Sequence, residues 1–195
     1  MFKIMREEVD GQAQGGAVLF PLNFNSGIMR GRFNSQDGQL YVVGLKVWQS
    51  SGARYGAFHR VRYTGKTVHM PAAMHVKKDG IEITFTNPLD AASAVDDQNY
   101  AVDQWNYQWT QQYGSKLYSI HDPSKVLGEK KQAVFSGDTV EIQSIKLSED
   151  KKTVFLEIAG LKPVMQSRIR FNIKAADGMI IKRDIFHTIN RVPAQ

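Results

Sequence analysis

Apolar and polar residues alternate along much of this chain, which is the spacing of half-buried β-strands. Ile81, Ile83 and Phe85 alternate with polar residues. Pro88 closes that run, because proline cannot donate to a β-ladder. A polar turn follows, the alternation resumes at Tyr100, and helical periodicity is almost absent. The pattern predicts an all-β protein built from antiparallel sheets.

Further strands are expected where similar runs are separated by turn residues. Asp37-Gly38 marks a tight hairpin between a strand that ends at Phe33 and a strong strand at 40–47. The run from Val9 to Gly16 is expected to be a loop. After Gly65, strands are predicted at 73–76, 81–86, 100–107, 140–147, 153–158, 167–173 and 184–189. Several short strands joined by turn signals are typical of an Ig-like β-sandwich.

The pattern of residues changes after residue 65, which divides the chain into two parts. Residues 1–65 are predicted to form a small β-sheet segment, and residues 66–195 are predicted to form the Ig-like sandwich. A long polar and aromatic insertion, at about 108–137, interrupts the second part. Long insertions on compact sandwiches often carry binding roles or pack on a neighbour.

The composition excludes several kinds of functional site. The chain has 195 residues, and 42% of them are hydrophobic, which is enough for a packed core. It has no cysteine, so disulfides, a thiol nucleophile, a zinc–thiolate site and a Cys-x-x-Cys-His haem attachment are excluded within it. No apolar run is long enough to cross a bilayer, and the N-terminus lacks the apolar stretch of a signal peptide. We therefore expect no membrane span.

The net charge of +6 is modest. Paired basic residues occur at likely hairpin tips, at Lys77-Lys78, Lys130-Lys131, Lys151-Lys152 and Lys182-Arg183. An electrostatic footprint for nucleic acid or anionic lipid is one interpretation. Solvated turn lysines that protect sheet edges are the favoured one. We expect no nucleic-acid partner.

Two parts of the chain resemble a known class of protein. The first part resembles the last blade of a β-propeller in the motifs Gly27–Phe33, Asp37–Leu45, Trp48-Gln49 and Phe58–Gly65. Residues 81–192 resemble the Ig-like domain that follows such propellers, through Asn106–Trp109, Tyr113–Ser115 and Tyr118-Ser119. The class is that of large secreted dehydrogenase-like proteins of planctomycete-type bacteria. They are distantly similar to quinoprotein sugar (sorbosone or glucose) dehydrogenases, and they commonly carry a c-type cytochrome module.

The resemblance implies a C-terminal piece of such a protein, or a small stand-alone relative. A propeller needs several blades, and only about one blade of sequence is here. The residues that hold a quinone or a calcium ion in such proteins therefore have no counterpart to match. No cofactor is expected within this chain, whereas haem c or a quinone is expected in a parent or partner protein. Apolar side chains of a lone blade need cover from the sandwich or another chain: Leu19, Phe20, Leu40, Val42 and Leu45.

A methionine–histidine group is the candidate metal site. His69 and His75 flank Met70 and Met74. Thioether and imidazole are suitable ligands for copper, and copper carriers of similar Ig-like shape exist. A haem axial ligand donated to another chain is a further alternative. The favoured interpretation is packing, because methionine commonly fills irregular gaps.

A group of aspartates surrounds one turn, at Asp90, Asp96, Asp97 and Asp103. Carboxylates in a loop suit calcium, and two carboxylates across a cleft suit glycoside hydrolysis. Helix capping and Asx-turns are the favoured interpretation.

Aromatic residues near the insertion form the candidate binding site, consisting of Trp105, Tyr107, Trp109 and Tyr113. In a regular strand the first three share one face, because alternate residues project together. Such a face can stack on sugar rings or on a partner, with neighbouring amides supplying hydrogen bonds. Core or interdomain packing is the favoured interpretation, because Tyr and Trp bury large areas.

These observations predict a non-catalytic structural or interaction module of a secreted dehydrogenase or electron-transfer protein. One alternative is part of a quinone- or haem-dependent sugar oxidoreductase that another chain completes. A second alternative is a carbohydrate-binding module that uses the aromatic face. The expected partners are other domains or chains of a larger secreted assembly, and carbohydrate is a further candidate. By resemblance, the location is periplasmic or extracellular.

Overall fold

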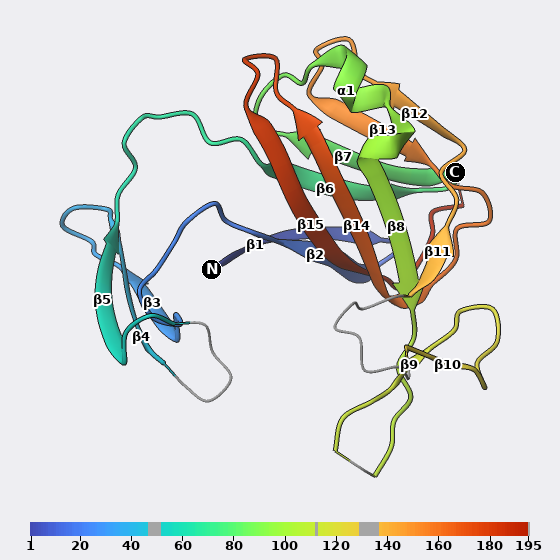
Figure 1. Ribbon diagram of the computed structural model, residues 1–195, viewed down its shortest axis with the longest axis horizontal. Coiled ribbons are helices and arrows are strands. Elements are labelled where there is room, and N and C mark those ends of the chain that lie inside the picture. Colours follow the sequence, from blue (N-terminus) through green and yellow to red (C-terminus); the bar gives the residue numbers. More distant parts are fainter. Residues whose placement is uncertain (47–51, 112, 129–136, 195) are drawn as a thin grey trace. The chain divides into compact units, whose positions relative to one another are not determined.

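The computed structural model describes residues 1–46, 52–111, 113–128 and 137–194, and their regular structure is almost entirely antiparallel β-sheet (Figure 1). The chain divides into two compact units. Unit 1 contains Met1 and residues 20–68, and unit 2 contains residues 2–19 and 69–195. The predicted all-β fold class is confirmed.

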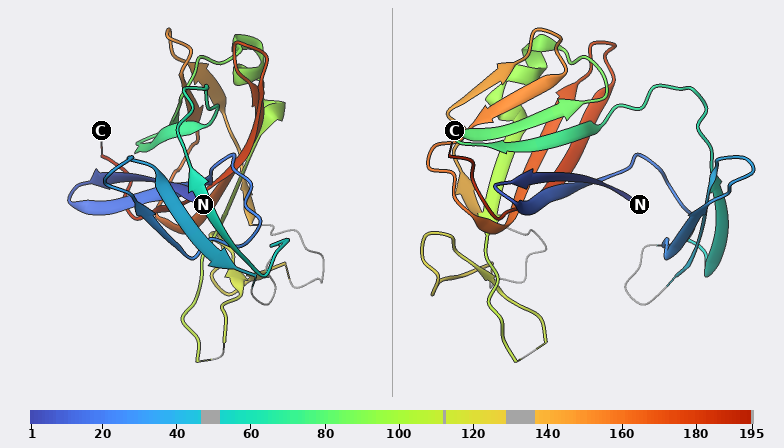
Figure 2. Two further views of the ribbon diagram at one scale, coloured as in Figure 1. Left: turned by 90° about the vertical axis from the view of Figure 1, so that its left-hand side faces the viewer. Right: turned by 180° about the vertical axis from the view of Figure 1, so that it is seen from behind.

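Unit 2 is a sandwich of two antiparallel sheets (Figure 2). The larger sheet has the order β1 (Phe2–Val9), β2 (Gln12–Leu19), β15 (Ile180–Ile189), β14 (Val164–Lys174), β8 (Tyr100–Trp105) and β11 (Asp138–Val140). The smaller sheet has the order β12 (Ser144–Leu147), β13 (Thr153–Glu157), β7 (Gly80–Phe85) and β6 (Pro71–Lys77). Every pairing in both sheets is antiparallel.

The core of unit 2 lies between these sheets. On β7, Ile81, Ile83 and Phe85 are buried while Glu82 and Thr84 are partly exposed, as the period-two pattern predicts. The larger sheet contributes Ile169 and Phe171 of β14. The rings of Phe85 and Phe171 meet edge to face, with centroids 5.5 Å apart, which is a favoured aromatic geometry. This contact joins the two sheets directly.

The polar turn before β8 is a helix α1 (Ala91–Val95) followed by a 3-10 helix η1 (Asp97–Asn99). Asp90 caps α1, since its Oδ1 accepts from the Ser93 backbone N–H at 2.9 Å. Hydrogen bonds from Ser93 hold the pKa of Asp90 below its usual value. Asp96 caps η1 by accepting from Gln98 N–H at 3.0 Å. These contacts are the capping geometry favoured from the sequence.

Unit 1 contains a three-stranded antiparallel sheet of β3 (Arg30–Phe33), β4 (Leu40–Leu45) and β5 (Gly56–Val61), in that order. The predicted hairpin at Asp37-Gly38 joins β3 to β4, and Gly38 has the positive φ of 65° that such turns need. One side of the sheet is covered by the segment that precedes it. There Val42 is buried, and Phe24 meets the ring of His59 edge-on at 5.3 Å.

The segment predicted as residues 1–65 is divided by the structure. Strands β1 and β2 belong to the sandwich, where β2 pairs with β15. The loop expected at 9–16 is also wrong, because only Asp10-Gly11 turns and β2 starts at Gln12. Its glycines serve close packing: a Cβ on Gly15 would lie 2.0 Å from the Met5 carbonyl oxygen, and one on Gly16 2.8 Å from His187 Cβ.

The run at 140–147 is two strands, β11 and β12, which lie in different sheets. Trp48-Gln49 and residues 129–136 of the insertion lie outside the described residues. Within the described part of the chain, no helix has the length and apolar character required to cross a bilayer.

Candidate binding site on the insertion

The insertion begins where β8 ends, at Trp105. Asn106 and Tyr118 form an isolated antiparallel bridge, with both N–H···O distances 2.9 Å. The chain then forms a short ladder between β9 (Leu117–Tyr118) and β10 (Val126–Leu127). Figure 1 shows this segment projecting from the end of β8. The bridge closes the base of the insertion directly after β8.

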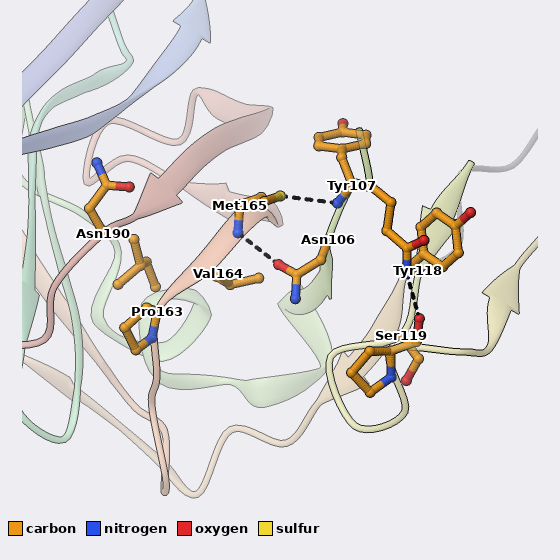
Figure 3. A pocket seen from close by; sticks show the side chains of 11 residues that line it. Asn106, Tyr107, Tyr118, Ser119, Pro163, Val164, Met165 and Asn190 are labelled. Atoms are coloured by element: carbon orange, nitrogen blue, oxygen red, sulfur yellow. Dashed lines mark hydrogen bonds between the residues drawn. The ribbon is translucent and has the colours of Figure 1, made fainter. Parts of the chain in front are cut away.

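Met165, at the start of β14, joins the insertion to the sheet (Figure 3). Its backbone N–H donates to Asn106 Oδ1 at 3.0 Å. Its sulfur accepts from the Tyr107 backbone N–H at 3.2 Å. These two contacts set the direction in which Tyr107 leaves the sandwich.

A pocket of about 380 Å³ lies at this junction, within the size range of small-molecule sites. Among the described residues, none of the side chains that line it is a carboxylate, an imidazole or a cation: they are Asn106, Tyr107, Gln108, Tyr118, Ser119, Pro123, Pro163, Val164, Met165, Ile189 and Asn190. Amides supply donors and acceptors, and tyrosine and proline supply apolar faces. This lining suits a neutral ligand with several hydroxyl groups.

A second hollow of about 330 Å³ shares Gln108 with this pocket and is also lined by Trp109, Thr110, Gly114 and Ser115. Gln108 is held at both ends. Its backbone N–H donates to Ser115 Oγ at 3.1 Å, and its Nε2 donates to the Pro123 carbonyl at 2.8 Å. Because Gln108 lines both hollows, they are neighbours along one surface.

The four aromatic candidates do not share one environment. Trp105 belongs to β8 and is 2% exposed, whereas Trp109 is 100% exposed. Gly137 lies against the Trp105 ring, since a Cβ there would come within 2.7 Å of Cε3. Tyr107 is partly exposed and Tyr113 fully exposed. The predicted three-ring row is absent from the described strands, because β8 ends at Trp105 and the alternation stops there.

Two carboxylates form hydrogen bonds with residues 119–124 of the insertion. Asp138 Oδ2 accepts from Ser119 Oγ and from the Ile120 backbone N–H, both at 2.7 Å. Asp122 accepts from the Ser124 hydroxyl at 2.6 Å and from its N–H at 3.0 Å. Hydrogen bonds from Ser124 lower the pKa of Asp122 from its usual value. This pKa shift reflects a turn that is closed by hydrogen bonds.

The methionine–histidine group is dispersed. His69 Nε2 lies 2.7 Å from Asp177 Oδ2, while His75 Nδ1 lies 3.1 Å from Glu7 Oε2. Met70 and Met74 are buried apolar side chains of the core. Met74 and His75 are consecutive in β6 and therefore face opposite sides. The four candidate ligands thus point to different neighbours.

A row of buried polar side chains crosses the interior face of the larger sheet. Gln104, Ser167 and His187 are paired neighbours on β8, β14 and β15, and each is at most 3% exposed. Within the described residues, Gln104 Nε2, Ser167 Oγ and both ring nitrogens of His187 have no hydrogen-bond partner. Burial lowers the pKa of His187 to about 4, so its ring is neutral at pH 7.

Tyr107, one of the candidates from the sequence, lines the pocket, whereas the opposite wall consists of residues that the sequence did not single out. Met165 and Asn190 lie far along the chain, at the start of β14 and just after β15. Nothing in their local pattern distinguishes them from other strand-end residues. Comparison of the chain with protein-family models, curated proteins and solved structures found no match.

Proposed function

We propose that this chain is a non-catalytic interaction module of a secreted dehydrogenase or electron-transfer assembly. The supporting observation is the exposed aromatic surface of the insertion, formed by Tyr107, Trp109 and Tyr113 beside two uncharged hollows. Exposed Trp and Tyr side chains are enriched among the residues that dominate protein interfaces. The sandwich supplies a rigid base for this surface through Met165.

The partner we propose is a propeller-bearing or cytochrome-bearing chain of the same assembly, as the sequence resemblance implies. Binding of the 195-residue chain to such a purified chain tests this by calorimetry. We expect Trp109→Ala to weaken binding about 30-fold, the scale of an interface hot spot. Tyr63→Ala is the matched control, because Tyr63 is an exposed aromatic residue of unit 1. Equal affinities for the wild type and the Trp109 variant would contradict the proposal.

A carbohydrate-binding role is the second candidate, and the uncharged pocket at Asn106 and Tyr107 favours it specifically. Amide groups and aromatic faces match the hydroxyl groups and apolar faces of a neutral sugar. Titration of neutral oligosaccharides should change the tryptophan fluorescence of the wild type and leave that of Trp109→Phe nearly constant. If the signal persists in that variant, Trp109 does not contact the sugar.

Completion of a quinone- or haem-dependent sugar oxidoreductase by another chain is a further proposal. It predicts that adding this protein to the partner chain raises sugar oxidation. Unchanged turnover alongside tight binding would favour the purely structural role.

A further inference from the structure

The net charge of the chain is concentrated in unit 1. Residues 20–68 contain seven of the 25 Lys and Arg residues and one of the 19 Asp and Glu residues. The rest of the chain therefore holds 18 of each sign, and unit 1 carries the whole net charge of +6. Five of the seven cations are arginines. A small unit with this charge attracts anionic ligands.

The three-stranded sheet places three of these arginines on one face. Arg32, Tyr41 and Arg60 form one cross-strand row, and Arg30, Val43 and Phe58 form the next. Residues paired in such rows project to the same side of the sheet, as do residues two apart in a strand. We call these six residues the arginine face.

The arginine face is open to solvent. Its three arginines are exposed, and Phe58 is 67% exposed. On the opposite face, by contrast, Val42 is buried and His59 is partly buried beneath Phe24. Among the described residues, none of the three arginines has a carboxylate within ion-pair distance, unlike Arg168 and Arg170 of unit 2, which both pair with Asp103.

An aromatic pair lies among the arginines. The rings of Tyr41 and Phe58 are stacked, with centroids 5.6 Å apart and planes 26° from parallel. The Tyr41 hydroxyl donates to Asp37 Oδ2 at 2.7 Å, and this hydrogen bond holds the Tyr41 ring in place. Asp37 is the single carboxylate of unit 1, and it also accepts from the Gln39 N–H. Phe58 is therefore a supported, exposed ring, with Arg60 two residues along its own strand and Arg30 in its cross-strand row.

This combination matches an acidic sugar polymer. A guanidinium group binds carboxylates and sulfates through two parallel hydrogen bonds. An exposed aromatic ring packs against the apolar face of a sugar. Single-stranded nucleic acids instead need successive aromatic platforms for successive bases. On the arginine face Phe58 is the exposed ring, and Tyr41 beside it is partly buried.

We propose that the arginine face binds an acidic oligosaccharide. Arg30, Arg32 and Arg60 hold its carboxylate or sulfate groups, and one sugar ring rests on Phe58. This site belongs to unit 1 and does not depend on the function proposed for the insertion.

The test uses the whole 195-residue chain and measures its binding to four labelled hexamers by fluorescence anisotropy. Oligogalacturonate carries carboxylates, dextran sulfate carries sulfates, maltohexaose is neutral, and oligo(dT) is a single-stranded nucleic acid. At least one acidic sugar should bind, with an affinity that falls as salt is added, because salt screens exposed charges. Maltohexaose should bind at least about tenfold more weakly, since it offers the arginines no anion.

Two variants and one control separate site binding from general charge. Arg32→Gln with Arg60→Gln should weaken acidic-sugar binding at least about tenfold, because two charge-assisted contacts are removed. Phe58→Leu should weaken it about threefold through loss of the ring face. Lys78→Gln with Lys182→Gln removes the same charge from exposed positions of unit 2 and should change it less than about twofold.

Three results would overturn the proposal. The first is that neither acidic hexamer binds. The second is that the Lys78 and Lys182 control loses as much affinity as the Arg32 and Arg60 variant. The third is that oligo(dT) binds more tightly than both acidic sugars. Circular dichroism melting curves establish that each variant is folded. The substituted side chains of the arginine face are exposed, so the variants should have the same melting temperature as the wild type.

Discussion

Acid sensitivity caused by His187 is the sharpest prediction for stability. The imidazole lies inside the sandwich at 1% exposure, and burial lowers its pKa from 6.5 to about 4. As the pH falls, His187 therefore takes up a proton near pH 6.5 in the unfolded chain but only near pH 4 in the folded protein. Stability is highest above pH 6.5 and falls as the pH drops below it. Linkage gives a loss of about 2 kcal/mol between pH 8 and pH 5.

The measurement is urea unfolding at pH 8, 6 and 5, compared between the wild type and His187→Leu. Leucine has similar size and no titratable group, so the variant should lose most of this dependence. Replacing an unpaired buried polar ring by an apolar side chain should not reduce stability at pH 8. His121→Gln removes an exposed imidazole and should keep the wild-type dependence. Identical pH slopes for the wild type and His187→Leu would refute the reasoning.

Two further changes test the packing of the sandwich. Asp103→Asn should reduce the free energy of unfolding by about 3 kcal/mol, because it removes the buried carboxylate charge that lies 2.7 Å from the guanidinium of Arg168. Urea unfolding checks this, and a loss no larger than that of the exposed Glu8→Gln would contradict it. Ile83→Ala should cost about 3 kcal/mol by opening a cavity at a fully buried position. The exposed Ile180→Ala is its control, and similar midpoints for the two variants would show that Ile83 is not a core residue.

Strands with a strict period of two were the most predictable part of the fold. β7 and β13 were located to within a residue or two, because each has one buried and one open face. The glycine-rich run at 12–16 is part of a strand where a loop is expected, since glycine occurs both in loops and where strands pack closely. Only the partner strand distinguishes the two cases, and here Met5 and His187 approach too closely for a Cβ.

The aromatic candidates illustrate a similar limit. Core or interdomain packing is the interpretation that the sequence favours for them, and Trp105 is buried in this way whereas Trp109 is fully exposed. The common face assumed for Trp105, Tyr107 and Trp109 required a strand that continues past 105. A bridge between Asn106 and Tyr118 ends it there, and that bridge depends on residues the local pattern does not include.

Local alternation alone determined that this chain forms antiparallel sheets, because side-chain direction in a strand depends only on residue parity. Which strands become neighbours was decided by tertiary structure, since pairing joins residues far apart in sequence. That is why β1 and β2 belong to the sandwich, why Met165 completes the pocket wall, and why scattered arginines share one face of unit 1.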